Sequence, residues 1–66
     1  MSPQRFAMRL RQIREQRGMT QEVLAEKVGV SRAYLSRLEM GRHDPPLSKL
    51  RKLAKALNVS IEKLLT

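Results

Sequence analysis

The sequence of 66 residues predicts an all-α fold, a compact bundle of five short helices. Apolar residues recur at spacings of three and four, as on one face of a helix, and no segment alternates as a strand does. Gly and Pro residues divide the chain into short segments, most of which begin with a Ser or Thr. Without cysteine no disulfide can assist folding, so we expect one domain over residues 1–66, held by helix packing alone.

The first helix is expected between Ser2 and Gly18. Ser2 can cap it, because its side-chain oxygen can accept a hydrogen bond from an amide of the first turn, and Pro3 suits the first helical position. Gly18 then ends a helix of about four turns. The apolar stripe of this helix consists of Phe6, Leu10 and Ile13.

Two shorter helices follow, separated by a tight turn at Gly29. Thr20 is expected to cap the second helix and Ser31 the third, which ends at Gly41. Because two helices that cross at a steep angle leave little room, small residues are needed at Ala25 and Gly29. The residues expected in the core are Leu24, Ala25 and Val28 of the second helix and Leu35 and Leu38 of the third.

A loop of sequence RHDPP, residues 42–46, leads into the fourth helix, which its prolines open. Asn58 can end this helix in a left-handed conformation, and Ser60 can cap a short fifth helix. The apolar residues of the fourth helix are Leu47, Leu50, Leu53, Ala54 and Leu57. Those of the fifth are Ile61, Leu64 and Leu65, which can cover the bottom of the core.

The chain is strongly basic, with 14 Lys and Arg against 6 Asp and Glu and a formal net charge of +8. Such a surface suits a polyanion such as nucleic acid, although excess charge can also serve solubility alone. No apolar run is long enough to span a membrane and no signal core follows Met1, so a cytoplasmic location is expected. One His, no Cys and scattered carboxylates predict no metal, no cofactor and no enzyme activity.

The third helix is expected to have two contrasting faces. At about 100° per residue, Leu35 and Leu38 point to the core side. The opposite side carries Ala33, Ser36, Arg37 and Met40, with Arg32 on its N-terminal flank. Short side chains let another surface approach closely, and guanidinium groups can bind guanine edges or phosphates. This face therefore fits a DNA groove, while a role as solvated surface charges stays the alternative for the two arginines.

Residues 20–46, TQEVLAEKVGVSRAYLSRLEMGRHDPP, resemble the helix-turn-helix family of the phage Cro and CI repressors and related bacterial regulators. The shared features are an initial Thr-Gln, a small residue at Ala25, a glycine at Gly29, and apolar residues at Leu24, Val30, Leu35 and Leu38. The later stretch LRKLAKALNVS, residues 50–60, resembles the fourth helix of that family. The resemblance implies a lambda-repressor-like, double-stranded-DNA-binding domain with its helix-turn-helix unit at about residues 20–40.

The resemblance also implies which residues contact DNA. The residues that would contact bases are Arg32, Ala33, Ser36 and Arg37. Those that would contact phosphates are Gln21, Tyr34, Arg42 and the backbone around Met40. Since many relatives have glutamine where this chain has Arg32 and Ala33, we expect guanine opposite arginine and a thymine methyl group opposite Ala33. Tyr34 lies between the two faces of its helix and either packs on the domain or reaches the DNA backbone, and His43 is expected to be a simple loop residue.

Arg14 and Glu39 flank the apolar stripes of the first and third helices. The family resemblance pairs these two positions in a partly buried salt bridge with a structural role. A bidentate contact would fix the orientation of the third helix, although the desolvation of both charges opposes its net stabilisation.

The expected function is regulation of transcription by a homodimer bound to an operator, in association with the nucleoid. Because one short helix contacts few base pairs, two copies on half-sites about 34 Å apart would double the contacts. The residues expected at the dimer interface, unless they cover their own core, are Val59, Ile61, Leu64 and Leu65. Glu22 and Glu26 are either ordinary surface acids or contacts for RNA polymerase. The alternative function is that of an antitoxin or adaptor, which would dock a protein on the same scaffold.

Overall fold

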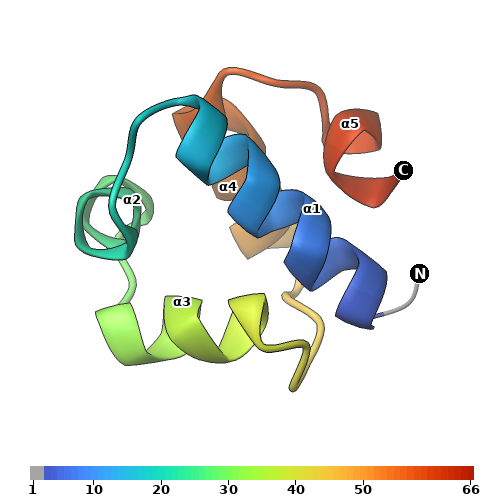
Figure 1. Cartoon of the computed structure of the whole chain (residues 1–66), viewed down its shortest axis with the longest axis horizontal. Coiled ribbons are helices and arrows are strands. Elements are labelled where there is room, and N and C mark those ends of the chain that lie inside the picture. The colour runs from blue at the N-terminus through green and yellow to red at the C-terminus, as the bar shows by residue number, and fades with distance from the viewer. Residues whose placement is uncertain (1–2) are drawn as a thin grey trace.

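The computed structural model describes residues 3–66 and contains five α-helices, with no strand in that range (Figure 1). The helices are α1 (Pro3–Gln16), α2 (Gln21–Val28), α3 (Arg32–Glu39), α4 (Leu47–Leu57) and α5 (Ile61–Leu65). In Figure 1, α1 crosses the front of the molecule, α3 runs along the lower edge, and α2 is seen nearly end-on. The predicted all-α class and the order of the helices are confirmed.

The apolar sides of the five helices form one shared core. Helix α1 packs against α3 and α5, and α2 packs against α3 and α4. The largest fully buried side chains are Phe6, Leu10, Leu24, Leu35, Leu38, Leu53, Leu57 and Leu64. Since burying one such side chain contributes about 1.5–3 kcal/mol, this core is the main source of stability and holds α2 and α3 in a fixed relation.

Three helices begin as the sequence predicts, with a hydroxyl group that accepts a backbone N–H of the first turn. The oxygen of Thr20 accepts from Val23 at 3.1 Å, that of Ser31 from Tyr34 at 3.0 Å, and that of Ser60 from Lys63 at 3.3 Å. Pro46 precedes α4, and no side chain caps that helix. Pro3 begins α1, as predicted, and the expected cap at Ser2 lies outside the described residues.

The predicted ends of the first four helices are also confirmed, because Gly18, Gly29, Gly41 and Asn58 have positive φ angles. The tight turn expected at Gly29 is confirmed, but the expectation that crowding between the helices requires a small residue there is wrong. A Cβ atom at Gly29 would have no atom within 4 Å, so its φ of +81°, and not crowding between helices, is what favours glycine there. At Gly41, with a φ of +74°, a Cβ atom would lie 3.2 Å from the Cα atom of Gln4, so crowding adds to the conformational requirement.

Two residues expected in the core are instead exposed. Leu47 is 56% exposed and Leu65 is 37% exposed, whereas Leu50 and Leu64 are buried. Leu47 is the first residue of α4 and lies about 70° from the centre of its apolar stripe, so no neighbouring helix covers it. Leu65 ends α5 one residue after the buried Leu64, and adjacent helical residues point about 100° apart. None of the helices within residues 3–66 has the length and apolar character needed to cross a membrane.

Candidate nucleic-acid interface

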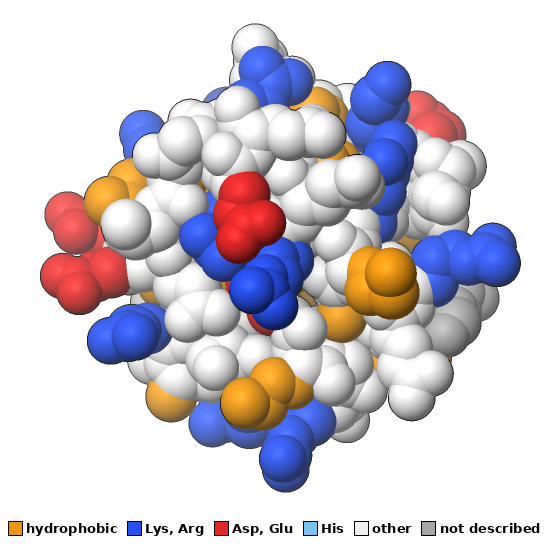
Figure 2. Space-filling model, viewed as in Figure 1, with side chains coloured by type: hydrophobic (Ala, Val, Ile, Leu, Met, Phe, Trp, Pro, Cys, Tyr) orange, Lys and Arg blue, Asp and Glu red, His pale blue; other side chains and the backbone are white. Residues whose placement is uncertain are grey.

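Helix α3 has the two faces that its sequence predicts. Leu35 and Leu38 are almost completely buried, whereas Arg32, Ala33 and Arg37 are exposed. Ser36, expected on the outer face, is only half-exposed. Figure 2 shows Lys and Arg side chains along the lower edge of the molecule, where α3 runs in Figure 1. An exposed cationic helix on a rigid core is suited to enter a groove of duplex DNA.

The C-terminal turn of α3 is closed by its own backbone. The Met40 N–H donates to the Ser36 carbonyl at 3.0 Å, and the Arg42 N–H donates to the Arg37 carbonyl at 3.2 Å. The Gly41 N–H donates to the Leu38 carbonyl at 3.2 Å. These amides already have acceptors, which disfavours the expected backbone contact between Met40 and a phosphate. The Met40 side chain is 62% exposed, and the Arg42 side chain is exposed and free to turn toward a phosphate.

Arg14, Glu39 and Gln21 join α1, α3 and α2 in one partly buried polar network. Arg14 donates from Nε to Glu39 Oε2 at 2.7 Å and from Nη2 to Glu39 Oε1 at 3.1 Å. Its Nη1 donates to the Met19 carbonyl at 2.7 Å. The side chain of Glu39 is only 3% exposed, so this carboxylate is desolvated and depends on its partners. The contact is the bidentate salt bridge that the family resemblance implies, and it fixes the end of α3 against α1.

The electrostatics of this network favour a permanently charged Arg14. The hydrogen bond to Glu39 raises the pKa of Arg14 above its usual value, and the negative charge of Glu39 adds to this effect, while burial opposes it. A raised pKa in the folded state means that the contribution of Arg14 to stability is fully present at neutral pH and would be lost only under strongly alkaline conditions. The guanidinium therefore neutralises Glu39 throughout the physiological range.

Gln21 is the third member of the network, and this contact was not predicted. Its side-chain Nε2 donates to Glu39 Oε1 at 3.1 Å, so one of its two N–H bonds is already used. Gln21 is the first residue of α2, and its backbone N–H belongs to the first turn, where amides have no intrahelical acceptor. The residues that line a recess at this helix end are Arg14, Thr20, Gln21, Glu22 and Arg32. The recess brings Gln21 and Arg32, two of the predicted DNA contacts, next to each other.

Tyr34 and His43 form an aromatic pair between α3 and the loop that follows it. Their ring centroids are 5.3 Å apart, and the ring planes are tilted by 34°. Tyr34 is half-buried and packs against the core, which agrees with the first of its two predicted roles. His43 is thus more than a simple loop residue. The sequence contains no pattern that pairs these two positions, because the contact depends on how the loop folds back on α3.

Among residues 3–66 there is no group of His, Cys, Asp or Glu side chains that could hold a metal ion. A second hollow lies between α2 and α4, and the DNA contacts predicted from the sequence do not line it. The recess at the start of α2 and the exposed face of α3 therefore form the candidate interface.

The sequence and the structure both resemble known helix-turn-helix proteins. The family model for helix-turn-helix proteins matches residues 10–64. An uncharacterized helix-turn-helix-type transcriptional regulator from Archaeoglobus fulgidus is 46% identical over 56 residues, which is 85% of this chain and 80% of the relative. The immunity repressor protein of Bacillus phage phi105 is 43% identical over 80% of this chain, which spans 37% of that repressor.

Two solved structures agree with these sequence matches. The restriction-modification controller protein C.AhdI from Aeromonas hydrophila has a TM-score of 0.91 and 35% identity, with 94% of each chain covered. The N-terminal DNA-binding domain of SinR from Bacillus subtilis has a TM-score of 0.85 and 35% identity, over 92% of this chain and 90% of that domain.

These matches confirm the family resemblance drawn from residues 20–46 and the predicted lambda-repressor-like architecture. They also confirm the prediction of a regulator that is not an enzyme, since family and relatives are transcription regulators. The chain belongs to the helix-turn-helix family of DNA-binding transcriptional regulators.

Proposed function

We propose that residues 1–66 form one domain that binds a specific duplex DNA sequence with α3 in the major groove. The observation that carries this proposal is the pair of faces on α3. Leu35 and Leu38 fix the helix to the core, while Arg32, Ala33 and Arg37 project into solvent on the other side. The major groove admits one α-helix, and it presents a distinct pattern of donors and acceptors for each base pair.

Each exposed residue of α3 has a defined chemical role in this proposal. Arg32 and Arg37 donate to the N7 and O6 atoms of guanine, which is the most common specific contact of arginine with DNA. Ala33 lies between them and leaves room for the methyl group of a thymine. Ser36, which is half-exposed, adds a hydroxyl group at the edge of the same face.

Phosphate contacts would hold α3 in register on both sides of the groove. At the start of α2, Gln21 can offer its backbone N–H and its remaining side-chain N–H to a phosphate, helped by the positive end of the helix dipole. Beyond the end of α3, Arg42 is exposed and can reach the backbone of the DNA. Tyr34 and Met40 remain secondary candidates, since Tyr34 packs on the core and the Met40 amide already donates to Ser36.

A homodimer on two half-sites would supply the contacts that one short helix cannot make alone. Among the residues expected at the dimer interface, Leu64 is fully buried and serves its own core. Val59 and Ile61 are half-buried, and Leu65 is exposed, so these three remain available to a second copy. Similar proteins include an immunity repressor, which supports repression as the mode of action. Binding to an operator would place the chain on the nucleoid.

The competing proposal is an adaptor that docks a protein on the same scaffold. The exposed face of α3 favours DNA, because Arg32, Ala33 and Arg37 offer no aromatic anchor of the kind that dominates protein interfaces. On α2, Glu22 and Glu26 are exposed and could meet RNA polymerase in an activating complex, in addition to DNA binding.

The decisive experiment is selection of bound sequences from a random duplex library with the 66-residue chain. We expect an enriched motif of two inverted half-sites about 34 Å apart, with guanine at the positions read by arginine. Enrichment of a single half-site would retain DNA binding and reject the dimer. If no sequence were enriched at low salt, the DNA-binding proposal would be wrong.

A further inference from the structure

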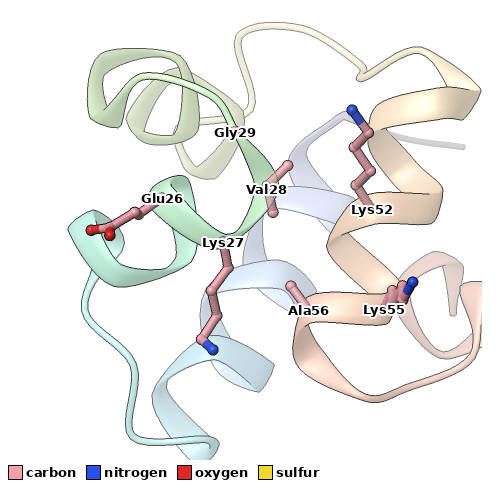
Figure 3. Close-up of a pocket in the computed structure, with 7 residues that line it drawn as sticks. All are labelled: Glu26, Lys27, Val28, Gly29, Lys52, Lys55 and Ala56. Carbon is pink, nitrogen blue, oxygen red and sulfur yellow. The ribbon is translucent and has the colours of Figure 1, made fainter.

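A shallow cleft lies between the end of α2 and the middle of α4 (Figure 3). Its lining residues are Glu26, Lys27, Val28, Gly29, Lys52, Lys55 and Ala56. Helix α3 contributes no residue to this lining. We propose that the cleft is a docking site for an acidic peptide segment of a partner protein, separate from the surface that contacts DNA.

Three lysines make the cleft strongly cationic. Lys27, Lys52 and Lys55 are exposed, and within residues 3–66 their amino groups form no hydrogen bond or ion pair. The one acid in the lining does not neutralise them, because Glu26 extends away from the lysines in Figure 3. Their charge is therefore available to carboxylates from outside the chain. A lysine amino group is a compact charge on a flexible side chain, so it can move to meet the carboxylates of an extended peptide.

The floor of the cleft is apolar, which distinguishes it from a simple patch of surface charge. Ala56, which is half-buried, and Val28, which is almost completely buried beneath it, lie between the three lysines in Figure 3, so Ala56 forms most of the accessible floor. Gly29 leaves the floor open, since even a Cβ atom there would have no neighbour within 4 Å. A small apolar side chain of a peptide can rest on this floor while the adjacent carboxylates meet the lysines. Duplex DNA would meet the three lysines with its sugar-phosphate backbone, which offers no apolar side chain to rest on the floor of the cleft.

The position of the cleft has a functional consequence. Its walls belong to α2 and α4, which pack against each other around the buried Leu24 and Leu53, so the cleft exists in the folded chain without any rearrangement. Because Arg32 and Arg37 lie on another helix, an acidic partner could occupy the cleft while α3 stays on DNA. The DNA-bound regulator could then recruit an acidic protein to the operator.

The proposal is tested by titrating the isotope-labelled chain with a 12-residue peptide of alternating Glu and Ala, followed by amide chemical shifts. We expect shifts concentrated at residues 26–29 and 52–56, and none with a matched peptide of alternating Gln and Ala. The double variant Lys52→Gln/Lys55→Gln should bind the acidic peptide about tenfold more weakly, since each exposed ion pair is worth up to about fivefold in affinity. The control Arg17→Gln/Lys63→Gln removes the same charge from two other exposed positions and should stay within about twofold of wild type.

Four outcomes would overturn the proposal. The acidic peptide could change the amide chemical shifts of α3 and not those of the cleft, which would mean that it binds to the surface proposed for DNA. Both double variants could weaken binding equally, which would show a response to net charge alone. The neutral peptide could bind as well as the acidic one, or a random duplex could shift the cleft amides as strongly as the peptide. Cleft shifts in a chain that binds no duplex would support this proposal and reject the proposed DNA function, so the two are tested separately.

Discussion

At the scale of single residues, Gly29 and Gly41 share a left-handed backbone but differ in their surroundings. Both have φ angles that residues with a side chain rarely adopt. Open space surrounds Gly29, whereas Gly41 faces the backbone of Gln4 at the start of α1. The conformation can be inferred from the sequence because helix ends favour glycine, but the approach of α1 cannot.

Alanine substitution should separate these two requirements. We expect Gly29→Ala to cost about 1–2 kcal/mol of unfolding free energy, from the left-handed conformation alone. Gly41→Ala should cost more, since the new Cβ atom would meet Gln4 at 3.2 Å and the start of α1 would have to shift. Urea unfolding of both variants measures the difference, and equal losses would mean that the contact with Gln4 contributes nothing.

Two arginines at the end of the reading helix should behave differently on DNA. Arg37 projects from the exposed face of α3, so Arg37→Ala should cost roughly 1–3 kcal/mol per half-site and flatten the preference at one base pair. Arg42 follows Gly41 in the loop and is placed for a phosphate. Loss of the Arg42 side chain should weaken binding to all DNA sequences alike. It should also lower the slope of log affinity against log salt by about one per half-site.

The measurement for this pair is the affinity of each variant for cognate and scrambled duplexes at several salt concentrations. If Arg37→Ala weakened binding to the cognate and the scrambled duplex by the same factor, Arg37 would contact only a phosphate. Sequence preference would then have to rest on Arg32, Ala33 and the shape of the DNA.

At the scale of elements, Glu39 connects three helices by hydrogen bonds. It accepts hydrogen bonds from Arg14 of α1 and from Gln21 of α2 while it ends α3. The resemblance to known repressors implied the first of these contacts. The second could not be inferred from spacing, because Gln21 and Glu39 lie 18 residues apart and meet only after α2 and α3 have packed.

Removing one partner from this network should destabilise the chain more than removing both. Glu39→Ala leaves Arg14 buried and unpaired, so we expect a loss of about 3 kcal/mol or more in the free energy of unfolding. Arg14→Met combined with Glu39→Leu should recover much of that loss, because no buried charge remains. Thermal or urea unfolding of Arg14→Met, Glu39→Leu and the double variant gives the coupling energy, because the same substitutions are made singly and together.

A matched control is the exposed pair Arg11 and Glu15, whose Nε and Oε2 atoms are 3.5 Å apart on the surface of α1. Alanine at either position should cost less than about 0.5 kcal/mol, and the two effects should add. If the losses of unfolding free energy at Arg14 and Glu39 also added simply, the pair would not connect α1 to α3.

At the scale of the whole molecule, local and long-range features differ in how far the sequence predicts them. Caps such as Thr20 and Ser31 act within one helical turn, so the order and limits of the helices follow from short patterns. Exposure depends on what lies across the core, which is why the core position predicted for Leu47 is wrong and why, of the two roles predicted for Leu65, the one in the core is excluded. The outer face of α3 could be predicted because it depends mainly on helical periodicity, which is a local feature of the sequence. The contacts that support it, from Gln21 to Glu39 and from His43 to Tyr34, depend on how α2 packs against α3 and on how the following loop folds back.

The net charge of +8 favours binding to DNA, and the number of phosphates that the bound chain neutralises should appear in the salt dependence of that binding. A complex that neutralises about six phosphates should lose on the order of a thousandfold in affinity between about 50 and 200 mM salt, because bound cations are released from the DNA. Fluorescence anisotropy with the selected operator measures the slope of log affinity against log salt. The variants Lys52→Gln/Lys55→Gln and Arg17→Gln/Lys63→Gln should both keep nearly this slope, since neither pair touches a phosphate in the proposed complex. A flat titration with the wild-type chain would contradict a phosphate footprint and would favour protein docking as the function of this scaffold.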